Sequence, residues 1–204
     1  ARLAAIGFVD ARGALRHIAA LTSGVSRRAQ IQRTLLPVIL QWLAEGADPD
    51  YGLLAFRRLS EDLGESYWFL RMLRDSSGAA QRLTSVLAAS RYVGGLFERI
   101  PEGAAWLESV DELRPRPLPA LLDEARATVD RHADDVDAAA KALRTARRRE
   151  VLRLALAGIL DVITVQELGR GLADVTTALL SGTLSLCHPA GDGIEFAIVA
   201  MGRY

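Results

Sequence analysis

Residues 136–186 read VDAAAKALRTARRREVLRLALAGILDVITVQELGRGLADVTTALLSGTLSL, and this stretch decides the fold. Its apolar residues recur with the period of an α-helix. The spacing predicts one helix over residues 136–163, which at 1.5 Å per residue is about 40 Å long. Thr164 and Glu167 then stand three residues apart, as in a capping box, where each side chain accepts a hydrogen bond from the other's backbone N–H. A second long helix is therefore expected to begin there and to continue to about residue 186.

The segment before these helices reads as a connector. Residues 114–119 are RPRPLP, and three prolines at alternate positions favour an extended backbone. A helix over residues 119–132 is expected to follow it. Three amphipathic helices joined by short turns predict an up-down-up bundle.

The N-terminal half carries shorter helices, each opened by a residue that can cap it. Helix-capping side chains occur at Asp10, Ser26, Asp48, Ser66 and Ser90. The helical period then places apolar residues on the faces directed at a core, among them Leu15 and Leu21 in the first helix and Val38 and Ile39 in the second. The expected helices cover residues 11–23, 27–45, 49–63, 67–75, 77–89 and 91–100.

The end of the sequence differs in kind. Residues 194–201, IEFAIVAM, are apolar on both alternating faces after Glu195, as in a strand buried within a sheet. A buried strand needs partners for its backbone groups. No other segment is typical of a strand, so we expect its partners to lie downstream, in residues that this chain does not include.

The expected fold class is therefore mainly α, a helical subdomain and a long-helix bundle, ending in one strand of an incomplete sheet. The expected divisions are a helical subdomain over residues 1–113, a connector over 114–119, a bundle over 120–193, and a strand with its glycine turn over 194–204.

Composition narrows the function classes. Lysine and arginine together number 25, as do aspartate and glutamate, so no global basic field favours nucleic acid. The sequence has no run of about 18 apolar residues that would span a membrane. A single cysteine, Cys187, cannot form an internal disulfide, which fits a reducing cytoplasmic setting.

Three stretches resemble the bifunctional glutamine synthetase adenylyltransferases of the actinobacterial type. Residues 90–102 are similar to a serine-started helix of that family that ends in a basic residue and proline. Residues 147–155, RRREVLRLA, are similar to its Arg-rich helix, and residues 196–204, FAIVAMGRY, to its first catalytic strand and glycine turn. The resemblance covers nearly the whole chain and fits the start of the adenylylating half best.

The resemblance implies a nucleotidyltransferase core, in which two aspartates on the next strand hold Mg²⁺ ions. ATP would then donate AMP to a tyrosine of glutamine synthetase, and a second head would remove the AMP by phosphorolysis. A PII-type signal protein is a further candidate partner. Because this chain stops at Tyr204, before those aspartates, we expect no catalytic residue in it and no transferase activity from it alone.

Two groups of residues are candidate sites. With the resemblance, Gly202 and Arg203 would approach the nucleotide phosphates, against the alternative of a plain strand-end glycine and a solvated arginine. Arg149, Glu150 and Arg153 would brace the long helix against the catalytic sheet, against the alternative of a solvated, salt-bridged face.

No metal ligands are expected in this chain. The Asp48-Pro49-Asp50 string and the Asp134-Asp135 pair stand at helix starts, where carboxylates serve as caps. The rival to an enzyme segment is a non-catalytic helical module for interaction or ligand sensing. A continuation of the gene into further glycines and an Asp-x-Asp string would favour the enzyme.

Overall fold

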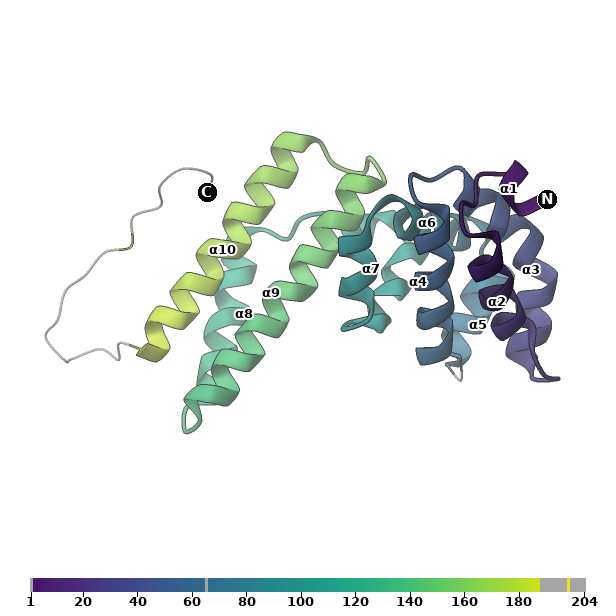
Figure 1. Cartoon of the computed structure of the whole chain (residues 1–204). Helices are drawn as coiled ribbons and strands as arrows, with labels where there is room; N and C mark the ends of the chain where they lie inside the picture. Colours follow the sequence, from purple (N-terminus) through teal and green to yellow (C-terminus); the bar gives the residue numbers. More distant parts are fainter. Residues whose placement is uncertain (1, 65, 188–197, 199–204) are drawn as a thin grey trace, which may run out of the picture. The chain divides into compact units, whose positions relative to one another are not determined.

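The chain is helical throughout the part that the structure describes. A computed structural model describes residues 2–64, 66–187 and 198. Within 2–64 and 66–187 every regular element is a helix (Figure 1), so the prediction of a mainly α fold is confirmed. Two compact units result. The first contains the described residues up to Arg114 together with Ala155–Val162, and the second contains Pro115–Leu154 and the described residues from Ile163 onwards.

The first unit is a cluster of short helices around one central helix. That helix packs against α3, α4, α5 and α7 and buries seven of its thirteen residues, Leu83 and Leu87 among them. Its leucines and alanines sit on several sides, which lets neighbours pack all around it. The elements of this unit are α1 (Arg2–Ala5), α2 (Ala11–Thr22), α3 (Arg27–Ala44), α4 (Pro49–Asp62), α5 (Tyr67–Asp75), the central α6 (Ser77–Ala89), α7 (Arg91–Phe97) and the 3₁₀ helices η1 (Pro101–Glu108) and η2 (Val110–Leu113).

The predicted caps account for most helix starts. The side chains of Asp10, Ser26, Asp48 and Ser90 each accept a hydrogen bond from the backbone N–H three residues later. These bonds satisfy donors that a helix leaves unpaired in its first turn. Ser66 precedes α5 without a side-chain cap, so its predicted capping role is wrong although the helix begins where expected.

The second unit is a three-helix arrangement of α8 (Leu118–Arg131), α9 (Val136–Ile159) through residue 154, and α10 (Val165–Cys187). The capping box is confirmed: the Thr164 N–H donates to Glu167 Oε2 at 2.7 Å and the Glu167 N–H to Thr164 Oγ1 at 3.2 Å. The three helices meet tightly at Gly182 of α10. A Cβ there would lie 3.0 Å from Leu143 of α9 and 3.3 Å from Ala125 of α8.

Two predicted core residues are wrong. Leu15 is 58% exposed and Val38 is 42% exposed, whereas the adjacent Ala14 and Ile39 are buried. The predicted Leu21 of α2 and Ile39 of α3 are buried, at 3% and 1% exposed, so the predicted faces are right in part and too wide at Leu15 and Val38. The short alanine is enough to let α2 approach its neighbours.

The long helix ends four residues earlier than predicted. Asp161 takes a left-handed backbone conformation, with φ of 55°. The Val162 N–H bonds to the Ala157 carbonyl and the Asp161 N–H to the Gly158 carbonyl, the pattern of a Schellman motif. Glycine usually holds this position, so an aspartate there gives a weak stop signal in the sequence.

The predicted strand over residues 194–201 lies almost wholly outside the described residues and stays a prediction. Among the helices that are described, none combines the length and the apolar character that a bilayer crossing requires.

Candidate functional site

An ionic cluster joins the connector to two helices of the second unit. Glu150 of α9 is only 7% exposed, which makes it the most deeply placed carboxylate of the described chain. Arg116 of the connector donates through Nη1 to Glu150 Oε1 at 3.1 Å and also to Glu124 Oε2 of α8. The Nε atom of Arg153 lies 3.3 Å from Glu150 Oε2. Two arginines and two carboxylates therefore neutralise one another at this place.

Charge pairing in this cluster favours the ionised form of Arg116. The pKa of Arg116 is raised above its ordinary value, chiefly by its hydrogen bond to Glu124 and further by the one to Glu150. Loss of one partner would leave the other charge only partly solvated, which costs far more than the pair contributes when intact. The cluster thus fixes where the connector lies on α8 and α9.

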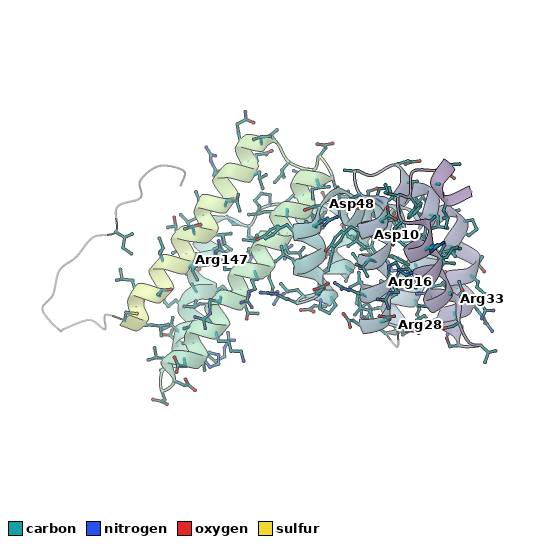
Figure 2. All side chains as sticks on the ribbon, viewed as in Figure 1. Asp10, Arg16, Arg28, Arg33, Asp48 and Arg147 are labelled. Atoms are coloured by element: carbon teal, nitrogen blue, oxygen red, sulfur yellow. The ribbon has the colours of Figure 1, made fainter. Side chains whose placement is uncertain are left out.

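A small cavity adjoins the cluster inside the three-helix unit. Its volume is about 30 Å³, and it is lined by apolar side chains together with Glu124, Arg147 and Glu150. Figure 2 labels Arg147 on α9. A space of this size holds about one water molecule, for which the two carboxylates would be acceptors. It has no room for a nucleotide. The apolar lining residues are Leu121, Ala125, Leu143, Ala146, Val175, Ala178 and Leu179.

The predicted site residues separate in the structure. Gly202 and Arg203 lie outside the described residues, so their proposed approach to a nucleotide stays a prediction. Of the bracing set, Glu150 and Arg153 pair with each other, and Glu150 is held by Arg116 of the connector. Arg149 is exposed and belongs to a different surface, a groove between α8 and α9. Bracing against a catalytic sheet stays a prediction.

Both aspartates at the start of α4 accept backbone hydrogen bonds, Asp48 as the predicted helix cap and Asp50 from a segment distant in the sequence. Asp48 accepts from the Tyr51 N–H at 3.0 Å and pairs with Arg91 at 2.7 Å. Asp50 accepts from the N–H groups of Val9 at 2.7 Å and Asp10 at 3.1 Å. Figure 2 labels Asp48 and Asp10 in this first unit. Both carboxylates are thereby committed to holding segments of the chain together.

Backbone and arginine contacts lower the pKa of Asp48. The Tyr51 N–H has the largest effect on this pKa, and the hydrogen bond from Arg91 adds to it. The Arg91 guanidinium also lies over the Tyr51 ring, 5.2 Å from its centroid. Within the described part of the chain, no three histidine, cysteine, aspartate or glutamate side chains come together as metal ligands would.

Sequence reasoning missed the contribution of Arg116 and of Asp50. Arg116 lies in the proline-containing connector, 34 residues from Glu150, and no local spacing connects the two. Asp50 reaches backbone donors some 40 residues away. In the sequence, Arg116 is recognisable only as a charged residue between two prolines, and this does not indicate which carboxylate it pairs with.

A family model described as "Glutamate-ammonia ligase adenylyltransferase" matches residues 80–204. The chain is 63% identical over its full length to a "Bifunctional glutamine synthetase adenylyltransferase/adenylyl-removing enzyme" of Leifsonia xyli, and covers 20% of that protein. Proteins of the same description from Cutibacterium acnes and Streptomyces coelicolor are 45% and 44% identical, and the chain covers 20% and 22% of them. The chain thus spans about a fifth of the length of these relatives. No solved structure matches it.

Proposed function

Because this chain belongs to the glutamate-ammonia ligase adenylyltransferase family, we propose that it is a segment of an enzyme that attaches AMP to glutamine synthetase and removes it again. Glutamine synthetase is another name for glutamate-ammonia ligase. The supporting observation is 63% identity along the whole chain to a relative that is named for both activities. ATP would supply the AMP, and phosphorolysis would remove it. We place this activity in the cytoplasm, where a lone thiol such as Cys187 stays reduced.

Within that enzyme, we assign the chain the part of a helical scaffold. The Arg116, Glu124, Glu150 and Arg153 cluster supports this assignment, because it fixes the connector onto α8 and α9, and the cavity of about 30 Å³ beside it is too small for a nucleotide. The described residues do not fit a magnesium site. Their best-placed carboxylates already accept hydrogen bonds from arginines or backbone amides. The metal ligands would therefore lie outside the described residues.

The test is an assay of the longer protein that contains this chain. Transfer of label from ATP carrying ³²P in its α-phosphate to purified glutamine synthetase measures the first activity. Release of labelled ADP after phosphate is added measures the second. We expect both from the longer protein and neither from residues 1–204 alone. Absence of both activities from the longer protein, or transfer by the 204-residue chain, would refute the proposal.

We also propose that the connector transmits regulatory signals from glutamine or a PII-type protein to catalysis. The anchoring of the connector by Arg116 supports this proposal, since the ion pairs of Arg116 with Glu124 and Glu150 can break and re-form. Arg116→Ala in the longer protein should alter the response of adenylylation to these effectors. Arg114→Ala is the matched control, because Arg114 is 61% exposed and pairs only at 3.5 Å with the exposed Asp111. Equal responses of the two variants would remove the idea.

A further inference from the structure

A second, more open feature of the three-helix unit lies between α8 and α9. It is a groove of about 450 Å³, large enough for a small organic ligand. Figure 1 shows the two helices running alongside each other in this unit. The groove is lined by Glu124, Thr128, Arg131, His132, Ala138, Lys141, Ala142, Thr145, Ala146 and Arg149.

The sequence of α9 explains why the groove stays open. Ala138, Ala142 and Ala146 recur every four residues, so they share one face of the helix, and their methyl groups leave the space unfilled. Lys141 and Arg149, which stand eight residues apart, lie on the adjoining face and border the same space. From α8, Arg131 borders it on the other side. A small-residue floor is thus flanked by long cationic side chains.

The cations that line the groove form no ion pair with the residues that the structure describes. Arg131, Lys141 and Arg149 are all exposed, and none forms an ion pair with another residue of the described chain. Between residues 138 and 149, α9 carries five basic residues and no carboxylate. The next residue, Glu150, is turned to Arg116 and Arg153. The only carboxylate lining the groove, Glu124, is bound by Arg116.

This arrangement is different from a solvated, salt-bridged helix face. Like charges at neighbouring helical positions destabilise a helix by a few tenths of a kcal/mol each, and an anion that lies among them removes that cost. The acidic residues nearby are grouped at one end, where Asp135 caps α9 by accepting from the Ala138 N–H at 2.8 Å. The anion-attracting part is therefore the other end, toward Lys141 and Arg149.

We propose that this groove is a binding site for a soluble small molecule that carries several linked phosphate groups. Lys141 and Arg149 are separated by about 12 Å along the helix, which is too far for one phosphate to contact both. Guanidinium groups hold phosphate oxygens in pairs of hydrogen bonds, whereas a lysine contributes a point charge. A linked series of phosphates, free or on a nucleotide, matches this row of cations in both charge and length.

The test is isothermal titration of the 204-residue chain with inorganic tripolyphosphate and, separately, with ATP, at constant ionic strength. Constant ionic strength is needed because exposed charges are screened within about 8–10 Å. We expect Lys141→Gln and Arg149→Gln each to weaken binding by about tenfold, the loss of one charge-assisted contact. Arg144→Gln is the matched control. It removes the same charge from the same helix, but Arg144 does not line the groove, and we expect less than a twofold change.

Amide NMR spectra locate the ligand and check the fold of each variant. Tripolyphosphate should shift the amide signals of Ala138, Ala142 and Ala146, while spectra of the unliganded variants stay native-like. No binding at millimolar tripolyphosphate, or an equal loss in all three variants, would overturn the proposal, because general electrostatic attraction does not distinguish Arg144 from Arg149. The outcome does not depend on glutamine synthetase, so it is separate from the test of the proposed function.

Discussion

Gly52 of α4 is the position where a single methyl group should harm the first unit most clearly. Gly52 is buried, and a Cβ at this residue would lie 3.0 Å from Ala88 Cα, 3.0 Å from Ala88 Cβ and 2.9 Å from a methyl carbon of Leu43. Ala88 lies near the C-terminal end of α6, and its Cα is part of the helix backbone. The Asp48 N–H donates to the Ala88 carbonyl at 2.9 Å, so α4 cannot withdraw from α6 without loss of that hydrogen bond.

The expected effect of Gly52→Ala follows from three contributions to the free energy of unfolding, two that lower it and one that raises it. Overpacking of a filled core costs about 1–3 kcal/mol. Weakening of the hydrogen bond to Ala88 costs about 1 kcal/mol. Replacement of glycine by alanine within a helix returns about 1 kcal/mol. The net expectation is a loss of about 2 kcal/mol.

The matched control is Gly95→Ala in α7. A Cβ at Gly95 meets no atom within 4 Å, so only the gain in helix propensity remains, up to about 1 kcal/mol. The two variants carry the same chemical change and should shift stability in opposite directions. With a urea slope of about 2 kcal/mol/M, the unfolding midpoint should fall by about 1 M for Gly52→Ala and rise by up to about 0.5 M for Gly95→Ala.

Tryptophan fluorescence measures this unit separately from the three-helix unit. All three tryptophans of the chain, at positions 42, 68 and 106, lie in the first unit. Urea titrations followed by fluorescence therefore give its midpoint. A Gly52→Ala midpoint equal to or above that of the unmodified chain would show that α4 and α6 do not pack as closely as described, and the reasoning would fail.

Three further predictions concern single polar residues. Gln32 is 1% exposed, and neither its amide nitrogen nor its amide oxygen has a hydrogen-bond partner among the described residues. Gln32→Met should therefore raise the free energy of unfolding by about 1–2 kcal/mol in the fluorescence assay, and a loss would show that the amide is paired, for instance by water. Glu150→Gln should lower the stability of the three-helix unit by about 1–3 kcal/mol, measured by circular dichroism at 222 nm, whereas Arg147→Gln, an exposed arginine, should leave it within about 0.5 kcal/mol. The folded-state pKa of Asp48 lies below its ordinary value of 3.8, so its contribution is complete above that pH and is lost as pH falls further. Asp48→Asn should therefore flatten the decline of stability with pH below about 4, and an unchanged slope would contradict the assignment.

Local signals in the sequence were sufficient for helix positions. Side chains that cap a helix act within three residues. Asp48 and the Thr164–Glu167 pair therefore indicate helix starts from the sequence alone. The end of α9 was predicted four residues too late. The helix stops at an aspartate in the left-handed conformation, and the usual sequence signal for that conformation is glycine.

Which face of a helix is buried was harder to predict than where the helix lies in the sequence. In α2 the choice between Leu15 and Ala14 depends on which neighbouring helix approaches and how closely. Hydrophobicity alone favours the larger side chain at the core. The structure instead buries the small Ala14, because close helix contact is an alternative to large apolar area.

The Arg-rich part of α9 shows the limit of local reasoning most directly. Helical spacing offers Glu150 two arginine partners, Arg147 at three residues before it and Arg153 at three residues after it. The structure pairs Glu150 with Arg153 and with Arg116, a residue of the connector, and this second pairing comes from tertiary structure.

Glu150 pairs with Arg116 and Arg153, so it does not neutralise the arginines directly before it on α9. The scaffold role and the phosphate-binding groove therefore have a common structural origin, but they predict different experimental results. Substitution of Arg116 or Glu150 should change stability or regulation, because it breaks a half-buried cluster. Substitution of Lys141 or Arg149 should change anion binding and leave stability nearly intact, since both side chains are exposed and unpaired within the described chain. A variant at Arg149 that unfolds the three-helix unit would show that the two groups of charges are one structural network.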